Sequence, residues 1–312
     1  MNASLLCAEG DGGERVDVWI SRAMEGVTRS LAQRLIQNGR VSVNGAPAQK
    51  SYIMKPGDVA EVSVPPPRDS MALAEPISIS VVYEDRHIIV VDKPQGMVTH
   101  PGNGNWSGTL VNALLHHCAG GLSDINGIVR PGIVHRLDKG TSGLLVAAKT
   151  NEAHQGLSAA FKAREVHKAY MAVVCGHVAE KTGRIEFAIG RSAKDRKKMA
   201  AYEHSGQPPA GTRDALSSYR VVSLLHGEHG RLTLLEVEIS TGRTHQIRVH
   251  LAAIGHPVLG DEAYGGAAAC PPGALLAGQL LHAYSLRFGH PATGEPMRFE
   301  SPLPDRFDPF VR

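Results

Sequence analysis

The sequence contains few cysteines and few aromatic residues, and both shortages restrict what the protein can be. Only four of its 312 residues are cysteines, and they lie far apart and form no CxxC pair. This spacing argues against a disulfide framework and a structural zinc site, and is typical of proteins in a reducing cytosol. Aromatic residues make up 5% and hydrophobic residues 42% of the chain, as in ordinary soluble proteins.

Signals for secretion or membrane insertion are also missing. The N-terminus lacks the basic start and the long apolar segment of a secretory signal peptide. No apolar run approaches the ~18 residues that a membrane-spanning helix needs. We therefore expect a soluble cytoplasmic protein without a membrane partner, and a monomer is the simplest expectation for its oligomeric state.

Neither an excess of charge nor a cofactor motif is present. The chain has 33 Lys and Arg against 30 Asp and Glu residues, so a surface that binds nucleic acid must come from local basic clusters. There is no GxGxxG after a predicted strand, no GxxxxGK[ST] and no HExxH. His116, His117 and Cys118 are adjacent on a predicted helix, where their side chains point apart, which argues against a metal site. We expect no cofactor and no metal.

Prolines and glycines mark the domain organisation. A chain of this length suits two domains, and three consecutive prolines begin a Pro-rich segment, residues 65–76, that favours an extended linker. The polar, Gly-rich residues 1–13 predict a flexible tail. We therefore expect a small domain over residues 14–64 and a larger domain over residues 77–312.

Two helices followed by short strands are predicted for the small domain. The first helix starts near Asp17, Thr28 caps the second, and strands are expected at residues 41–43 and 59–64. The second helix and its end carry a basic cluster with no acidic member: Arg29, Arg34 and Arg40. Such a cluster can neutralise RNA phosphates, although three arginines alone slightly favour a solvated helix face.

In the larger domain, strand patterns outnumber helix patterns and do not alternate with them as repeated βαβ units. Residues 232–239 alternate between apolar and polar side chains, which predicts a half-buried antiparallel strand. Helices are expected to begin at Thr109, Asn151 and Thr244. These patterns predict an α+β fold with a mostly antiparallel mixed sheet.

The stretch from Gly132 to Val146 places a carboxylate among basic side chains. Short apolar runs at residues 133–134 and 144–146 predict strands on either side of a polar loop, which carries His135, Arg136, Asp138, Lys139, Thr141 and Ser142. Reactive groups often lie on a loop held by a rigid scaffold. Aspartate is also common in ordinary turns, so spacing alone leaves both interpretations open.

The segment His135-Arg136-Leu137-Asp138, followed by Thr141-Ser142-Gly143, resembles the signature of the RluA family of pseudouridine synthases. Further segments follow in family order, namely Asp92-Lys93-Pro94, His100 to Asn105, Tyr170, Gly242 to Arg248, and Gly260-Asp261 with Tyr264-Gly265-Gly266. Residues 14–64 resemble an S4-like RNA-binding domain. Within the family the chain is most similar to the RluD branch, which acts on large-subunit ribosomal RNA.

The resemblance implies an isomerase that detaches uracil from its ribose, rotates the base and rejoins it through carbon, without a cofactor. Asp138 would act on the ribose, either by attacking the anomeric carbon or by removing the C2′ proton to give a glycal. Burial would raise the pKa of Asp138 above ~3.9, and Arg248 would lower it again. Tyr170 would stack on the uracil and place its hydroxyl near C5.

RNA contacts around this site are also implied. A uridine in an RNA stem must be extruded before reaction, and Arg136 would fill the vacated stack or hold the flanking phosphate. Further candidates for RNA binding are His135, Thr141, Arg243 and His245, together with Lys194, Arg196 and Lys197 in the basic loop at residues 191–198. By itself that loop is typical of a solvated loop, whereas in a protein that binds RNA a contact with phosphates is an equal alternative.

Two alternatives remain open at this point. A relative that modifies transfer RNA would carry the same motifs, and a non-catalytic ribosome-assembly factor with this fold would bind RNA without changing its nucleosides. The S4-like domain and the run from His100 to Asn105 favour the ribosomal branch. Large-subunit ribosomal RNA, free or in a ribosomal particle, is therefore the expected partner.

Overall fold

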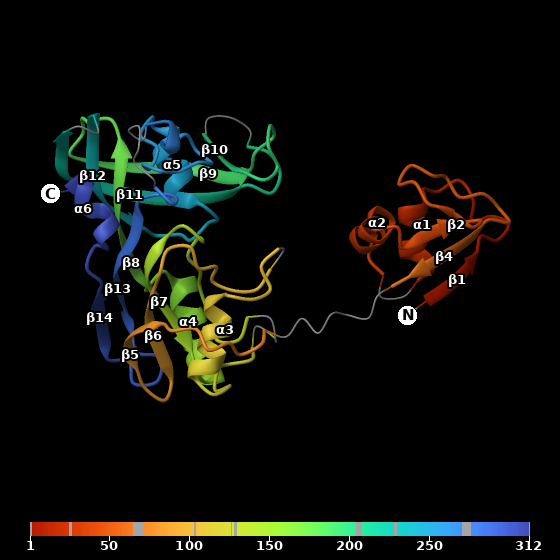
Figure 1. The fold of residues 1–312 in the computed structure, drawn as a ribbon, viewed down its shortest axis with the longest axis horizontal. Helices are drawn as coiled ribbons and strands as arrows, with labels where there is room; N and C mark the ends of the chain where they lie inside the picture. The colour runs from red at the N-terminus through yellow and green to blue at the C-terminus, as the bar shows by residue number, and fades with distance from the viewer. Residues whose placement is uncertain are drawn as a thin grey trace. The chain divides into compact units, whose positions relative to one another are not determined.

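The boundary between the two domains falls within the predicted linker. The structure is a computed structural model that describes residues 2–24, 27–64, 72–102, 104–125, 127, 130–203, 208–227, 230–269 and 276–311. The chain divides into two compact units, residues 1–70 and 71–312 (Figure 1). The first half of the predicted linker, residues 65–71, lies outside the described residues. Its second half belongs to the larger unit, because Ala72 is buried and the Asn112 amide donates to the Leu73 carbonyl (2.8 Å).

The first unit packs two helices on a four-stranded antiparallel sheet with strand order β1-β4-β2-β3. Its elements are β1 (Asn2–Leu6), α1 (Val16–Ala23), α2 (Arg29–Gln37), β2 (Val41–Val43), β3 (Ala46–Pro47) and β4 (Val59–Ser63). As predicted, the Thr28 hydroxyl caps α2 by accepting from the Leu31 N–H (3.3 Å). Asp17 is fully buried, and although burial opposes it, hydrogen bonds from Gln33, Arg29 and Arg15 lower the pKa of Asp17 to about 2.

The prediction of a flexible tail over residues 1–13 is wrong. β1 pairs with β4 along its whole length, from Asn2 opposite Ser63 to Leu6 opposite Val59. Ala3 and Leu5 share one face of the strand and pack against the hydrophobic core, in which Cys7 is 1% exposed. The sequence did not reveal this strand because five residues next to a glycine-rich turn are too few to show a clear alternation of apolar and polar side chains.

The larger unit is built on a ten-stranded sheet and confirms the predicted α+β fold. Strand order is β10-β9-β11-β12-β8-β13-β7-β6-β5, and β14 also pairs with β13. Every pairing is antiparallel except that of β7 with β13. Its elements are β5 (Ser80–Glu84), β6 (Ile88–Lys93), α3 (Leu110–His117), β7 (Ser142–Ala148), α4 (Asn151–Ala163), β8 (His167–Cys175), β9 (Thr182–Arg191), β10 (Met199–Tyr202), β11 (Arg213–Gly227), β12 (Gly230–Ile239), α5 (Gln246–Ala253), η1 (Gly266–Ala269), β13 (Leu281–Gly289), β14 (Pro296–Glu300), η2 (Asp305–Phe307) and α6 (Asp308–Val311).

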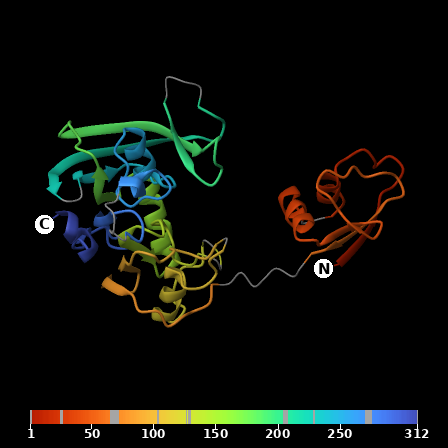
Figure 2. The ribbon, with the colours of Figure 1, turned by 45° about the horizontal axis from the view of Figure 1, so that its top comes forward.

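The sheet is buried on both faces around β6 and β7. Alternate residues of β7 belong to different cores, with Leu145 facing the core that contains α3 and Leu144 facing the core that contains α4. Figure 1 and Figure 2 show α3 and α4 at one end of the sheet, and α5 beside β9 and β10 at the other. Gly143 has φ +113°, and a Cβ there would lie 2.3 Å from the Ala283 carbonyl oxygen, so this glycine permits the close approach of β7 and β13.

Several predicted boundaries need correction. The N-cap of α4 is Thr150 rather than Asn151, because the Thr150 hydroxyl accepts from the Ala153 N–H (3.2 Å). The N-cap of α5 is His245 rather than Thr244. Ile133 forms only an isolated bridge with Ala147, so the strand predicted at residues 133–134 does not form. In the described part of the chain, no helix is both long and apolar enough to cross a membrane.

Candidate active site

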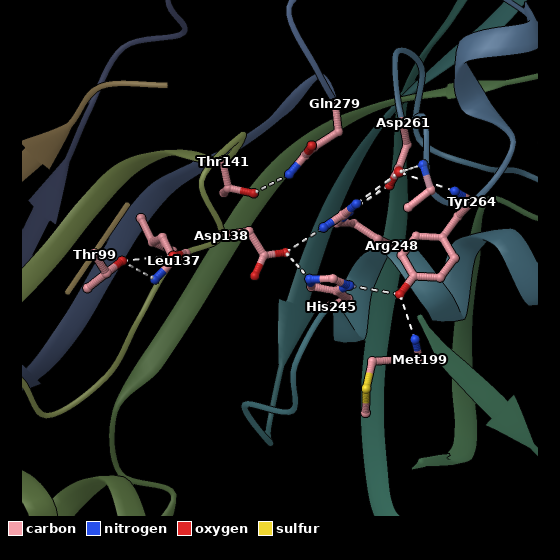
Figure 3. A network of polar contacts seen from close by, with 11 residues as sticks. Thr99, Leu137, Asp138, Thr141, Met199, His245, Arg248, Asp261, Tyr264 and Gln279 are labelled. Atoms are coloured by element: carbon pink, nitrogen blue, oxygen red, sulfur yellow. Dashed lines mark hydrogen bonds and ion pairs between the residues drawn. The ribbon is translucent and has the colours of Figure 1, made fainter. Parts of the chain in front are cut away.

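Asp138 lies on the loop that leads into β7, and contacts on both sides hold this loop in place. Leu137 is buried, and the Thr99 hydroxyl donates to its carbonyl (2.8 Å) and accepts from its N–H (3.3 Å) (Figure 3). The Thr141 N–H donates to the Asp138 carbonyl (3.0 Å), and the Thr141 hydroxyl accepts from the Gln279 amide (3.1 Å). The Asp138 carboxylate is therefore presented from a backbone with little freedom to move.

Arg248 of α5 joins two carboxylates. Its Nη1 donates to Asp138 Oδ2 (2.9 Å), while Nε and Nη2 donate to the two oxygens of Asp261 (2.6 and 2.9 Å). Asp261 is fully buried, and its Oδ1 also accepts from the N–H groups of Ala263 and Tyr264. Although burial opposes it, the hydrogen bonds and charges of Asp261 and Asp138 raise the pKa of Arg248. Asp261 thus orients a permanent cation toward Asp138.

His245 lies on the other side of Asp138. Its Nε2 is 3.9 Å from Asp138 Oδ2, and its Nδ1 is 2.8 Å from the Tyr264 hydroxyl. That hydroxyl also accepts from the Met199 N–H (3.0 Å) at the start of β10. In Figure 3 the side chains of Asp138, Arg248 and His245 point toward one another. Asp138 precedes His245 and Arg248 by more than a hundred residues, and only the fold brings it next to them.

A cavity of about 310 Å³ opens beside this cluster. Tyr170 of β8 is 6% exposed and lines the cavity together with Asp138. Burial, and next the Asp138 charge, raise the pKa of Tyr170, so its phenol stays protonated at neutral pH. All eight residues that we predicted around the catalytic loop and α5 line the same cavity: His135, Arg136, Asp138, Thr141, Tyr170, Arg243, His245 and Arg248.

Besides Arg248, the cavity is lined by basic side chains that have no carboxylate partner in the part of the chain that the structure describes. Arg136 is exposed and makes no side-chain hydrogen bond or ion pair with any described residue. Arg243 is half-buried, and its Nε donates to the Asp214 carbonyl (3.2 Å). Lys168, which we did not predict, lies with its Nζ 5.1 Å from the centre of the Phe161 ring, and burial lowers its pKa to about 8. This arrangement suits a polyanionic ligand.

His135 and Thr141 line the cavity, and their side chains are also bound within the protein. The Val146 N–H donates to His135 Nε2 (3.1 Å), and the His135 ring packs against Phe161 at 4.8 Å between centroids. Burial, and next the Lys168 charge, lower the pKa of His135 to about 3, so the ring is neutral. Thr141 is 2% exposed and bound to Gln279. Both residues therefore support the Asp138 loop, and their predicted contacts with RNA stay a prediction.

The stability of the protein should depend on pH through His135. Its pKa is about 3 in the folded state and ~6.5 in the unfolded state. Between these values the unfolded state binds the extra proton, so the free energy of unfolding should fall by up to about 1.4 kcal/mol per pH unit as the pH drops below 6.5. Urea unfolding at pH 7 and pH 5 measures this loss. In His135→Gln the side-chain amide oxygen can accept from the Val146 N–H, so the free energy of unfolding should fall less between pH 7 and pH 5. An equal fall in both proteins would contradict the role of His135 in the pH dependence.

The other predicted basic residues lie outside the cavity. Lys194, Arg196 and Lys197 are exposed on the loop between β9 and β10, which leads directly to Met199 and its bond with Tyr264. Arg34 and Arg40 are exposed in the first unit. Arg29 is also in that unit, where its Nε is 3.1 Å from Asp17 Oδ2, so part of its charge stabilises the fold.

Asp261, Tyr264 and Lys168 are the site residues to which sequence reasoning assigned no role. Asp261 and Tyr264 stood within a recognised segment, but their contacts with Arg248 and His245 depend on tertiary structure. Lys168 is two residues before Tyr170 on β8, and strand periodicity places the two side chains on the same face. That periodicity was the available signal for Lys168. Among the described residues, no group of three His, Cys, Asp or Glu side chains could hold a metal ion.

Known proteins resemble the chain over almost its whole length. The model of the family described as RNA pseudouridylate synthase matches residues 87–253, and that of the S4 domain matches residues 14–59. The Bacillus subtilis protein named uncharacterized RNA pseudouridine synthase YlyB is 40% identical over 301 residues, covering 96% of this chain and 94% of its own. The ribosomal large subunit pseudouridine synthase D of Pseudomonas aeruginosa is 42% identical over 305 residues, covering 95% and 90%.

A solved structure supports the same assignment. Human RNA pseudouridylate synthase domain containing 1 superposes with a TM-score of 0.58 at 30% sequence identity, covering 74% of this chain and 86% of its own. The family match, the full-length relatives and the fold agree on one family. The chain therefore belongs to the RluA family of RNA pseudouridine synthases and carries the S4 domain found in part of that family.

Proposed function

We propose that this enzyme converts specific uridines of large-subunit ribosomal RNA to pseudouridine, with Asp138 as its one catalytic carboxylate and without a cofactor. The observation that carries the proposal is the ion pair between Asp138 and Arg248 at a cavity lined by otherwise unpaired basic side chains. The name of the Pseudomonas aeruginosa relative supports large-subunit ribosomal RNA as the substrate.

The hydrogen bonds favour Asp138 over Asp261 as the reacting group. Both oxygens of Asp261 are occupied by Arg248, and one also accepts two N–H groups. Only one oxygen of Asp138, Oδ2, is bound to Arg248. A retaining glycosidase uses two carboxylates because an oxygen leaving group needs a proton. Uracil can leave as an anion, so a single carboxylate is sufficient.

Two routes for Asp138 are compatible with this geometry. In one, Asp138 forms a bond to C1′ while the C1′–N1 bond breaks, and the ester is displaced when C5 of the rotated uracil attacks C1′. In the other, Asp138 takes the C2′ proton while the base leaves, and returns a proton to C2′ as C5 bonds to C1′. Both routes end with loss of the C5 proton and protonation of N1. The protonated Tyr170 phenol suits stacking and hydrogen bonding near C5 better than service as a tyrosinate base.

Nucleoside-resolved mapping of RNA from cells with and without the gene tests the substrate. We expect pseudouridine to be lost at specific positions of large-subunit ribosomal RNA. Loss from transfer RNA instead would support the alternative of a transfer-RNA synthase. An unchanged pattern in both RNAs would support a non-catalytic assembly factor and contradict the proposed function.

The first unit is expected to add affinity for structured RNA. Deleting residues 1–70 should weaken binding to a structured ribosomal RNA fragment by about tenfold or more, because a linked second binding surface is lost. Turnover of a minimal stem-loop should stay close to that of the full chain, since every residue lining the cavity belongs to the second unit. Anisotropy titrations and single-turnover rates measure the two effects. Equal affinities with and without the first unit would remove its role in RNA docking.

A further inference from the structure

His245 holds an uncommon backbone conformation in the middle of the site. Its φ of 56° and ψ of 22° lie in the left-handed region, which a residue with a side chain adopts at an energetic cost. Strained residues of this kind persist where the surroundings hold them in place, and they cluster at functional sites. Here the conformation directs the ring into the cavity between Asp138 and Tyr264.

The hydrogen-bond partners of the Tyr264 hydroxyl indicate which nitrogen of the His245 ring carries the proton. The Met199 N–H can only donate, so the Tyr264 oxygen accepts from it (3.0 Å). If His245 Nδ1 also donated to that oxygen, the Tyr264 hydroxyl proton would have no acceptor among the described residues. The Tyr264 hydroxyl therefore donates to Nδ1 (2.8 Å), and the proton of the neutral ring is on Nε2.

The protonated Nε2 faces the catalytic carboxylate across a gap. It lies 3.9 Å from Asp138 Oδ2, which is too long for a direct hydrogen bond. A hydroxyl oxygen about 2.8 Å from each atom can lie beside this gap, donating its proton to Asp138 and accepting from Nε2. The two groups thus form a matched acceptor and donor for one hydroxyl group.

We propose that His245 recognises the 2′-hydroxyl of the target nucleotide and that Tyr264 positions His245 for this contact. The inference rests on the proposed function, because that function brings C1′ and C2′ of the ribose to Asp138. Within an RNA strand the 3′ and 5′ oxygens are esterified, so the 2′-hydroxyl is the free hydroxyl of the ribose, and it distinguishes RNA from DNA. His245 is then a specificity-determining residue.

The test compares two stem-loop RNAs that differ only in carrying uridine or 2′-deoxyuridine at the target position. Dissociation constants are measured by fluorescence anisotropy with the full chain in an Asp138→Asn background, so that turnover does not interfere. The asparagine amide oxygen facing Arg248 can still accept from the 2′-hydroxyl. Without a change at His245, the uridine RNA should bind about tenfold more tightly, the size of one net hydrogen bond. His245→Asn suits the left-handed backbone and should reduce this ratio to near one. Tyr264→Phe, which frees the ring, should reduce it in part.

His167→Asn serves as the matched control, because His167 is exposed on β8 and does not line the cavity. It should keep the tenfold ratio. An unchanged ratio in His245→Asn, or a ratio of one with His245 intact, would overturn the inference. A separate activity assay tests the proposed function itself. If that function is wrong, the protein with Asp138 intact forms no pseudouridine in the uridine RNA.

Discussion

Replacing Asp138 by asparagine is expected to reduce pseudouridine formation by about 10⁴-fold or more, the size of effect seen when a residue central to catalysis is removed. Asparagine has nearly the same shape, but it can neither attack C1′ nor accept the C2′ proton. Asparagine is also common in turns. The loop is held by the bonds from Thr99 to Leu137 and from Gln279 to Thr141, which do not involve the Asp138 carboxylate. The fold and the RNA affinity should therefore change little.

Glu262→Gln provides the matched control for this variant. Glu262 is next to Asp261 in the sequence but is exposed, and it makes no side-chain contact with a described residue. The substitution removes the same charge and should leave turnover unchanged. Single-turnover assays on a stem-loop RNA measure both variants. Turnover of Asp138→Asn near that of the unchanged enzyme would show that the catalytic assignment is wrong.

Replacing Arg248 by methionine should impair both turnover and stability. Turnover should fall by about 10²-fold or more, because the cation that orients Asp138 is lost. Asp261 is fully buried and would lose its bidentate partner, keeping only the N–H groups of Ala263 and Tyr264. Removing one partner of a buried ion pair typically lowers the free energy of unfolding by about 3–5 kcal/mol. Urea unfolding followed by circular dichroism measures that loss.

Arg243→Met separates this effect from a general loss of positive charge. Arg243 lines the same cavity, but it is half-buried and its Nε donates to a main-chain carbonyl instead of a carboxylate. The substitution should weaken RNA binding and make that binding less dependent on salt concentration. It should leave the free energy of unfolding nearly unchanged. Equal stability of Arg248→Met and the unchanged enzyme would contradict a structural role for the Arg248–Asp261 pair.

Sequence patterns predicted the larger features of the fold correctly. Thr28 and Thr109 cap helices as expected, and residues 232–239 form a strand. Short elements were less predictable. The strand at residues 2–6 was missed, and the cap of α5 is His245 in a left-handed conformation rather than Thr244, because local propensity does not contain the contacts that stabilise such a residue.

The sequence by itself determined the two domains, the α+β class and, through its motifs, the family and the candidates Asp138, Tyr170 and Arg248. Only the tertiary structure decided what each side chain contacts. It paired Asp261 with Arg248 and Tyr264 with His245, and it showed that His135 and Thr141 are bound to Val146 and Gln279 next to the Asp138 loop. The physical reason is that a residue's type sets the chemistry available to it, whereas its partners and burial depend on segments that are distant in the chain and meet only when the sheet is complete.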